Sequence, residues 1–332
     1  MSKRKKRPVR RPPSGSTPGD TTRTGTKQTG TKGAGTKGAG TKTAGAKPTS
    51  KRRPPPRGAR RGLLPRWAPW VGIAVVVGAI GIALLLRNTS SASATKPASG
   101  QVTSAISSVP AATFDAVGVP SGLAAPKPLP SGTPAVEADG LPLVLYVGAE
   151  YCPYCAAERW PLAVALSRFG SFSDLSVTES AGFPEVYPHT PTLSFHGASY
   201  TSPHLAFQGL ETATNKLGIT GYGQLDTLTP EQQRLVQTYD APPYVTTKGG
   251  IPFVLIGNRY VFNGAQYLPD VLRGKSAEQI AAELSDPQSG VSAAVVGSAN
   301  LLTAAICQIT GQAPKDVCTS SAVTAAAKDL GS

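Results

Sequence analysis

The sequence predicts an α/β domain with a helical insertion and a C-terminal helical extension, preceded by a basic tail and one transmembrane helix. Three observations support this prediction. An apolar run at Leu143–Val147 leads into a mostly helical pattern from Ala156 to Phe169. A second apolar run begins at Pro252, turns at Gly257-Asn258 and continues as another strand pattern. A strand–helix unit and a later strand pair are typical of a mixed sheet with helices packed on it. The third observation is a stretch of 20 residues without charge, residues 67–86.

The N-terminal tail, residues 1–66, carries 20 Lys/Arg and a single acid, Asp20, which gives it a net charge of +19. Residues 88–332 hold 12 Lys/Arg and 18 Asp/Glu, so the basic character of the chain belongs to the tail. Such a segment buries too little apolar surface to offset its conformational entropy, and we expect it to be disordered. Its Gly-Thr-Lys repeat over residues 25–44 fits either a solubilising tail or attachment to anionic lipids of the cytoplasmic leaflet. It has no aromatic residue to stack on bases, which argues against a nucleic-acid partner.

Residues 67–86 have the length and composition of a transmembrane helix. Trp67 and Trp70 fall at one edge of this run, where amphipathic rings prefer to lie, and Arg66 and Arg87 flank it. The positive tail should remain on the cytoplasmic side. The sequence therefore predicts a single-pass protein of the cell membrane, with a cytoplasmic N-terminus and an extracytoplasmic C-terminal domain.

Two alternatives concern processing of this segment. Ser91–Ala94 has the small residues of a signal-peptidase site, although the apolar run is long for a cleaved signal. Arg60-Arg61 resembles a twin-arginine export signal, although an Arg-Arg pair is unsurprising in so basic a tail. Residues 88–133 are rich in Ser, Ala and Pro, and we interpret them as a linker, within which Val117–Leu123 could pack on the edge of the domain. The folded domain is then predicted to span residues 134–332.

Within the domain, residues of about 205–245 are predicted to be a helical insertion. Thr229-Pro230-Glu231-Gln232 matches a capping box with proline at the first helical position. Ser276-Ala277-Glu278-Gln279 is expected to begin another helix, and the C-terminal extension, about 288–332, contains a further helical pattern. Two more strands are predicted, at Leu175–Thr178 and Thr192–Phe195.

The motif Cys152-Pro153-Tyr154-Cys155 lies between the first strand and the helix after it. Backbone N–H groups at a helix N-terminus carry partial positive charge, which favours a thiolate. Two intervening residues keep the second thiol close enough to attack a mixed disulfide formed by the first. This arrangement is typical of thiol–disulfide exchange.

The residues around this motif resemble the thioredoxin superfamily. Ala149-Glu150-Tyr151-Cys152 is similar to the Trp-Ala-Glu-Trp-Cys of thioredoxins, and the Pro-Tyr dipeptide is the one usual in glutaredoxins. The longer string GAEYCPYCAAERWPLAVALSRFG resembles a group of membrane-anchored, thioredoxin-like actinobacterial proteins of the domain-of-unknown-function 929 type. This resemblance runs from about Pro142 to the C-terminus. It implies a thioredoxin-like fold for the domain.

The resemblance also implies roles for particular residues. Cys152 would be the attacking thiol and Cys155 the resolving one. A cis-proline is expected at Ile251–Pro252, facing the dithiol. The substrate groove would be lined by Tyr151, Pro153, Tyr154, Ile251 and Pro252. Thioredoxins place a buried aspartate six positions before the first cysteine, where this chain has Tyr146, which puts thioredoxin-like reduction in doubt. Glu150 is given no catalytic role, because a surface glutamate is the simpler interpretation.

The second cysteine pair, Cys307 and Cys318, is not a CxxC motif. Three interpretations stay open: a structural disulfide of the C-terminal extension, a second redox pair that relays electrons to Cys152 and Cys155, or free buried thiols. A structural disulfide that closes so short a loop would contribute roughly 2–3 kcal/mol.

The sequence predicts neither a metal nor an organic cofactor. One CxxC supplies two ligands where structural zinc needs four, and the three histidines, His189, His196 and His204, have no ligand spacing. Nucleotide and nucleophile-elbow motifs are missing. The hypothesis is a thiol–disulfide oxidoreductase that forms or isomerises disulfides in exported proteins and exchanges electrons with a membrane redox partner. The alternatives are an inert binding or scaffold domain and a metallochaperone.

Overall fold

The computed structural model describes residues 95–331. Its central sheet is built around β4 (Leu141–Gly148), the first predicted strand. β12 (Phe253–Ile256) pairs antiparallel with one edge of β4, and β9 (Ala206–Glu211) pairs parallel with β4 along residues 143–148. β13 (Tyr260–Asn263) pairs with β12 as predicted, and β2 (Lys127–Pro128) pairs with β13.

Side chains of the central strands alternate between two apolar cores. Val144 and Tyr146 of β4 belong to one core, whereas Leu143, Leu145 and Val147 belong to the other. β12 divides in the same way, because successive side chains of a strand point to opposite faces. A strand that is apolar on both faces requires cover on both. The sequence therefore reads as a continuous apolar run rather than an alternation.

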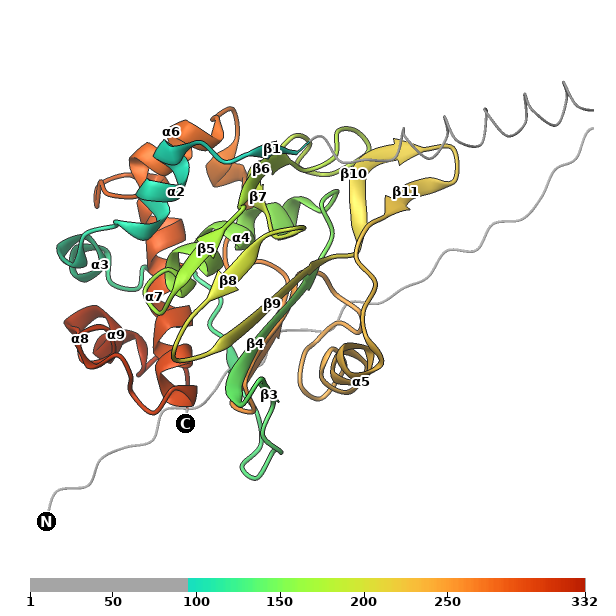
Figure 1. Ribbon diagram of the computed structural model, residues 1–332. Coiled ribbons are helices and arrows are strands. Elements are labelled where there is room, and N and C mark those ends of the chain that lie inside the picture. The colour runs from blue at the N-terminus through green and yellow to red at the C-terminus, as the bar shows by residue number, and fades with distance from the viewer. Residues whose placement is uncertain (1–94, 332) are drawn as a thin grey trace, which may run out of the picture. The chain divides into compact units, whose positions relative to one another are not determined.

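Helices supply that cover (Figure 1). α4 (Pro153–Leu166) and α7 (Gly290–Ile309) pack together on one face, and α5 (Pro230–Tyr239) covers the other with Leu235 and Tyr239. Both predicted capping boxes are present, at Thr229 for α5 and at Ser276 for α6 (Ala277–Glu283). Pro161 lies inside α4.

α7 is the one helix among residues 95–331 that is long and apolar enough to cross a membrane. Its best window has a mean hydropathy of 1.6, but 89% of that window is buried inside the protein. Most of its side chains belong to the core that it shares with α4, which is typical of a core helix rather than a membrane span. The predicted span at residues 67–86 and the predicted disordered tail at residues 1–66 lie outside the described residues.

The predicted linker is wrong for residues 95–133, which form part of the domain. This segment contains β1 (Lys96–Pro97), α2 (Gly100–Ser107) and α3 (Ala111–Val117). Ile106 and Phe114 are buried in the same core as α4 and α7. The Asn300 side chain of α7 donates hydrogen bonds to the carbonyls of Phe114 and Gly118, at 3.0 and 2.8 Å. The two short helices contain few apolar side chains, so their Ser/Ala-rich composition resembles that of a linker. Val117 and Leu123, for which packing on the domain was left open, do pack on the core.

The predicted helical insertion at about 205–245 is wrong except for α5. The region begins with β9, the parallel neighbour of β4, and continues as a hairpin of β10 (Ala213–Gly218) and β11 (Gly221–Gln224). β9, with the sequence AFQGLE, has little apolar alternation and is half-buried along most of its length, so its sequence does not indicate a strand. Antiparallel strands lie between α4 and β9 instead: β5 (Ser171–Ser173), β6 (Ser176–Glu179), β7 (Pro191–Ser194) and β8 (Ser199–Thr201).

The remaining elements complete the two ends of the domain. β6 pairs with both β1 and β7, and β5 pairs with β8. β3 (Glu137–Ala138) forms a hairpin with the start of β4 through Asp139-Gly140, whose φ angles of 53° and 75° suit an Asp-Gly turn. The predicted C-terminal helical extension is present and contains α7, α8 (Lys315–Cys318) and α9 (Ser321–Ala326). A short 3₁₀ helix, η1 (Pro269–Leu272), follows β13.

Candidate functional site

The two cysteines of the CxxC motif lie where β4 ends and α4 begins. Cys152 is the N-cap of α4, and its Sγ accepts a hydrogen bond from the Cys155 backbone N–H at 3.2 Å. Pro153 occupies the first turn, where its missing N–H costs nothing and its fixed φ suits a helix. The sequence therefore places one sulfur at the positive end of a helix dipole, as predicted.

The structure brings Ile251 and Pro252, the other part of the predicted substrate groove, next to this thiol. The Cys152 Sγ lies 3.8 Å from the Ile251 carbonyl oxygen, to which the thiol can donate. The Ile251–Pro252 bond is cis, as expected. The Pro252 carbonyl accepts a hydrogen bond from the Gly264 N–H at 2.8 Å, which connects this segment to the end of β13. Cys152 and the Ile251 carbonyl thus face one another although 99 residues separate them.

The two tyrosines predicted to line the substrate groove each contact another tyrosine. Tyr151 stacks on Tyr222 of β11, with ring centroids 4.2 Å apart, and Tyr154 meets Tyr187 edge-on at 5.8 Å. The sequence does not show that Tyr222 and Tyr187 lie beside the dithiol, because neither is near the motif in the chain. These four half-buried rings come from three segments and lie next to the dithiol, and we call them the tyrosine rim.

The environments of the two thiols push their pKa values apart. The pKa of Cys152 is lowered, chiefly by a hydrogen bond from the Cys155 thiol, then by the Cys155 backbone N–H and the charge of Arg159, while burial opposes the shift. The pKa of Cys155 is raised well above its ordinary value, first by burial and then by its interaction with Cys152. Cys152 is 5% exposed and Cys155 is fully buried. These differences suit an attacking thiol at Cys152 and a resolving thiol at Cys155.

A buried ion pair lies behind the dithiol. Arg159, one turn after Cys155, donates from Nε and Nη2 to the two carboxylate oxygens of Glu211, at 2.7 and 2.6 Å. Both side chains are fully buried. Arg159 also donates to the Tyr146 hydroxyl at 3.1 Å and to the Ala149 carbonyl at 2.8 Å. Its positive charge favours the thiolate form of both cysteines.

The sequence does not reveal this pair, because Arg159 and Glu211 are 52 residues apart and come from different elements. Tyr146, six residues before Cys152, is itself part of the cluster. It is fully buried, and burial raises its pKa well above the ordinary value for tyrosine. Tyr146 therefore stays neutral, and the charges near the dithiol are those of its neighbours.

Glu150 is buried, which corrects its interpretation as a surface residue. Its side chain is completely inaccessible and accepts a hydrogen bond from the Ser194 hydroxyl. The other carboxylate oxygen, Oε2, is buried without a hydrogen-bond partner. Glu150 lies in the turn immediately before the dithiol, and its sequence context alone does not show that the side chain is buried.

Glu158 is a second buried carboxyl that the sequence did not reveal. It follows Cys155 by three residues in α4, and its Oε2 accepts a hydrogen bond from the Gln266 backbone N–H at 3.0 Å. Burial raises the pKa of Glu158 to about 8, although the bond from Gln266 acts in the opposite direction. This carboxyl is therefore protonated in the folded protein at neutral pH.

We expect Glu158→Gln to flatten the pH dependence of stability. An unfolded glutamate titrates near 4.5, so the folded protein binds one more proton than the unfolded chain between about pH 4.5 and 8, and stability falls as pH rises. The variant should be more stable than the parent at pH 8 by about 2 kcal/mol. This is roughly half of the free energy that corresponds to the full pKa shift, because relaxation and water entry reduce the cost of burying the charge. Urea unfolding at pH 5 and 8 measures the difference. The exposed Glu231→Gln is the control, and an equal pH slope in all three proteins would contradict the assignment.

The second cysteine pair forms a disulfide, Cys307–Cys318, with a Cα–Cα distance of 5.6 Å. Free thiols are thus excluded for this pair. It lies at the far end of β12 from the dithiol, because Ile309 of the same helix contacts Gly257, whereas Cys152 faces Ile251. Gly257 is six residues after Ile251, and six residues of extended chain span about 20 Å, so the two cysteine pairs are well separated. Direct electron relay between the pairs would need the domain to open, which favours a structural role.

The three histidines do not assemble into a metal site. His189 pairs with Glu179 at 2.8 Å and His196 with Asp226 at 2.7 Å. Over residues 95–331 no group of three or more His, Cys, Asp or Glu side chains is placed to hold a metal ion.

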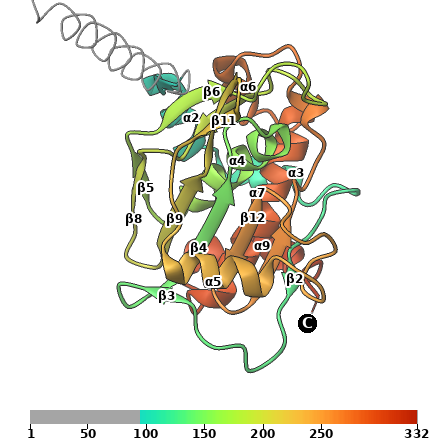
Figure 2. The same cartoon turned by 90° about the vertical axis from the view of Figure 1, so that its right-hand side faces the viewer.

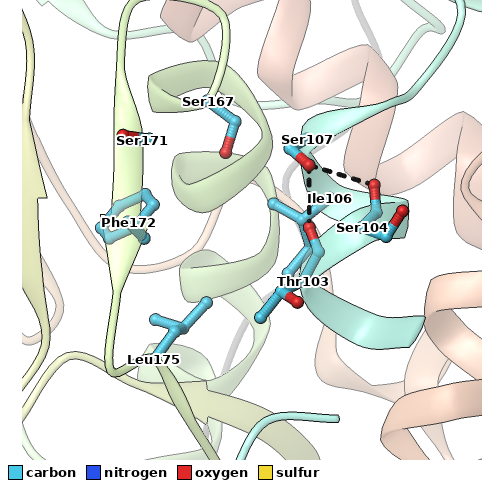
Figure 3. Close-up of a pocket in the computed structure, with 8 residues that line it drawn as sticks. All are labelled: Thr103, Ser104, Ile106, Ser107, Ser167, Ser171, Phe172 and Leu175. Atoms are coloured by element: carbon cyan, nitrogen blue, oxygen red, sulfur yellow. Dashed lines mark hydrogen bonds between the residues drawn. The ribbon is translucent and has the colours of Figure 1, made fainter. Parts of the chain in front are cut away.

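A hollow of about 310 Å³ lies away from the dithiol, between α2, the end of α4 and β5 (Figure 3). No charged side chain lines it, and its wall is made of Ser, Thr and apolar residues. The Ser107 hydroxyl bonds to the carbonyls of Thr103 and Ser104, at 3.0 and 3.2 Å. The hollow therefore offers hydroxyl and apolar groups but no acid, base or thiol.

Comparison with known proteins places the chain in a family. No curated protein and no solved structure matches it. One family model matches residues 135–308, which is more than half of the chain and includes β4, the dithiol, Arg159, Glu211 and most of α7. The chain therefore belongs to the family described as a domain of unknown function, DUF929.

Proposed function

We propose that this protein is a membrane-anchored, extracytoplasmic thiol–disulfide oxidoreductase that uses Cys152 and Cys155. One observation carries the proposal. A thiol with a lowered pKa caps a helix, faces the backbone carbonyl of Ile251, and has a fully buried partner thiol with a raised pKa behind it. Disulfide exchange requires a nucleophile of this kind and a second thiol to resolve the mixed disulfide.

The arrangement of the domain supports a thioredoxin-like fold as part of this proposal. The dithiol begins the helix that follows a central strand, and Pro252 begins an antiparallel strand pair beside it. Both features are those that the sequence resemblance implies. The strands β5 to β8 and the C-terminal helices would then be additions to that fold.

Disulfide formation would proceed from the Cys152–Cys155 disulfide. A substrate thiolate attacks the Cys152 sulfur, the bond between the two cysteines breaks, and its electron pair leaves on Cys155. A second substrate thiolate then attacks the substrate sulfur of the mixed disulfide, and Cys152 leaves as a thiolate. Because a thiol of low pKa leaves faster, the lowered pKa of Cys152 assists the second step. A membrane redox partner takes two electrons from the reduced pair and restores the disulfide.

The surroundings of Cys152 would position the substrate. The Ile251 carbonyl, 3.8 Å from the sulfur, is available to accept a backbone N–H of an extended substrate. Pro153 and the rings of Tyr151 and Tyr154 would contact its apolar side chains. Exported proteins with thiols or disulfides are the proposed substrates, because the predicted span at residues 67–86 places the domain outside the cytoplasm.

A second candidate function is an inert binding domain, which the small exposure of Cys152 favours. Only 5% of this residue is accessible, so a substrate must approach the sulfur closely through the tyrosine rim. A thiol buried only for packing would have no lowered pKa, and alkylation rates against pH separate the two functions.

The reduction potential of the Cys152/Cys155 pair tests the proposed function. The full chain in detergent is equilibrated in thiol redox buffers, and free thiols are counted by mass-tagging. We expect a potential of about −120 to −200 mV, the range of oxidants and isomerases. A potential below about −300 mV, typical of structural bridges, would exclude catalysis and leave the binding function.

A further inference from the structure

The exposed large apolar side chains of residues 95–331 are not scattered. They are Phe183, Val186, Leu217, Ile219 and Leu268, which we call the apolar rim. Phe183 and Ile219 are 91% and 98% exposed. All five lie on three loops: the loop after β6, the tip of the β10–β11 hairpin and the loop after β13. A group of exposed apolar side chains in one region is typical of an interaction surface.

Each of the three loops contacts the turn that holds the dithiol or the first turns of α4. The Ala181 N–H in the loop after β6 donates to the Tyr151 carbonyl at 3.0 Å. Tyr222 of the hairpin stacks on Tyr151. Tyr267, beside Leu268, donates from its hydroxyl to the Ala157 carbonyl at 2.8 Å. The loops that carry the apolar rim are therefore all anchored on the segment that holds the dithiol.

The loops also contact one another. The Tyr222 hydroxyl donates to Glu185 at 2.9 Å, which joins the hairpin to the loop after β6. A cavity of about 390 Å³ lies between residues 186–190 and residues 269–274, so the loops after β6 and η1 form its two walls. The apolar rim is thus carried by two loops that are in direct contact and by a third loop across this cavity.

The chain enters the domain at the same end. β1 pairs with β6, with Lys96 opposite Val177, and β6 leads directly into the loop that carries Phe183. Figures 1 and 2 both place β6 and the β10–β11 hairpin at one end, and β3 at the other. The predicted span ends at residue 86, nine residues before the first described residue, Thr95. Nine residues reach at most about 30 Å, so this tether keeps the rim end close to the membrane.

We propose that the apolar rim inserts into the interface of the lipid bilayer that anchors the chain, so that the dithiol faces the membrane surface. A bilayer suits the apolar rim because its aliphatic and phenyl side chains are exposed, whereas the tyrosine rings on the same segments are half-buried. Amphipathic tyrosine rings prefer the head-group level of a membrane. Lys216, exposed beside Leu217, can keep its charge in water while its stem lies along the apolar surface.

This orientation limits which partners reach Cys152. A redox partner embedded in the same membrane meets the dithiol directly, whereas an exported substrate must reach Cys152 along the membrane surface, because the opposite end of the domain, with β3, faces the solution. The proposal depends on the predicted span and on the rim, and it holds whether or not the dithiol performs catalysis. Its failure and the failure of the proposed function are therefore distinguishable.

Quenching by brominated lipids tests the insertion in the full chain. In a Trp67→Phe/Trp70→Phe background reconstituted in nanodiscs, Phe183→Trp and Ile219→Trp each add a tryptophan to the rim. Both positions are almost completely exposed, so neither change disturbs the core. Ser131→Trp is the matched control, because it is exposed in the loop after β2, at the far end of the sheet. Bromine near the head groups should quench the added fluorescence of the rim variants about two-fold more than that of the control, because interfacial side chains insert by only 5–10 Å.

Equal quenching of the rim tryptophans and the control would overturn the proposal and leave the rim free to bind a polypeptide in solution. Photoactivatable lipids provide a second measurement on the unmodified chain. Their label should appear on peptides covering residues 181–189 and 214–222 and not on residues 127–133. Label confined to peptides before residue 95 would also overturn the proposal.

Discussion

Cys152→Ser is expected to reduce oxidative folding of a reduced, disulfide-containing substrate to the uncatalysed rate. The loss should be about a thousand-fold or more, because exchange within a held pair benefits from a high effective concentration of the second thiol. A hydroxyl at position 152 accepts the Cys155 N–H as the sulfur does, so the start of α4 should persist. The measurement is the rate at which a reduced substrate regains activity, with the full chain in detergent micelles.

Cys155→Ser should lose turnover to a similar degree for a different reason. Serine at position 155 cannot form the disulfide that a substrate thiolate attacks, so oxidation of a reduced substrate stops. With a disulfide-containing substrate the Cys152 thiolate can still attack, but no buried thiol resolves the mixed disulfide, so a covalent complex should accumulate and be visible on a non-reducing gel. Cys307→Ser/Cys318→Ser is the control, because it removes the other pair at the far end of the sheet and should retain exchange. Loss of that disulfide should instead lower stability by roughly 2–3 kcal/mol. Unchanged turnover in Cys152→Ser would refute the assignment of the dithiol.

Arg159→Met is expected to lower the free energy of unfolding by about 3–5 kcal/mol, because it leaves the Glu211 carboxylate buried without its partner. The two side chains are fully buried and joined by two hydrogen bonds of 2.6 and 2.7 Å. Arg159→Met/Glu211→Leu should recover much of this loss, since an apolar pair of similar volume has no charge to solvate. Denaturant unfolding of the single and double variants measures the coupling.

The same substitution should raise the pKa of Cys152, since the charge of Arg159 is one of the causes that lower it. Alkylation rates against pH report this change independently of stability. Arg234→Met is the matched control: Arg234 pairs with Glu231 at 2.9 Å, but both side chains are 69% exposed, so we expect a change below about 1 kcal/mol. Equal losses of stability in Arg159→Met and Arg234→Met would show that the buried pair has no special role.

Local features of this chain were predictable because their causes are local. Cys152 caps α4 and Pro153 follows it because a helix start selects such residues, and Thr229 and Ser276 form the two capping boxes for the same reason. The strand pair after Pro252 was likewise apparent from a short apolar run with a Gly-Asn turn. Each signal depends on a few adjacent residues, whose backbone requirements do not change with the rest of the fold.

The environment of the dithiol was decided by tertiary structure. Glu150, Glu158, Arg159 and Glu211 are ordinary charged residues in the sequence, and nothing adjacent to them shows that all four are buried. The pairing of Arg159 with Glu211 depends on β9 lying beside β4. These two strands pair in parallel although their paired residues are 63 positions apart, and the sequence of β9 does not predict this pairing. α2 and α3 were mistaken for a linker because they have few apolar side chains, and these form part of a core only when they pack with distant helices such as α7. The motif itself follows from chain-local rules, whereas its electrostatics and its apolar rim follow from contacts between distant segments, because burial and charge pairing are properties of the packed chain.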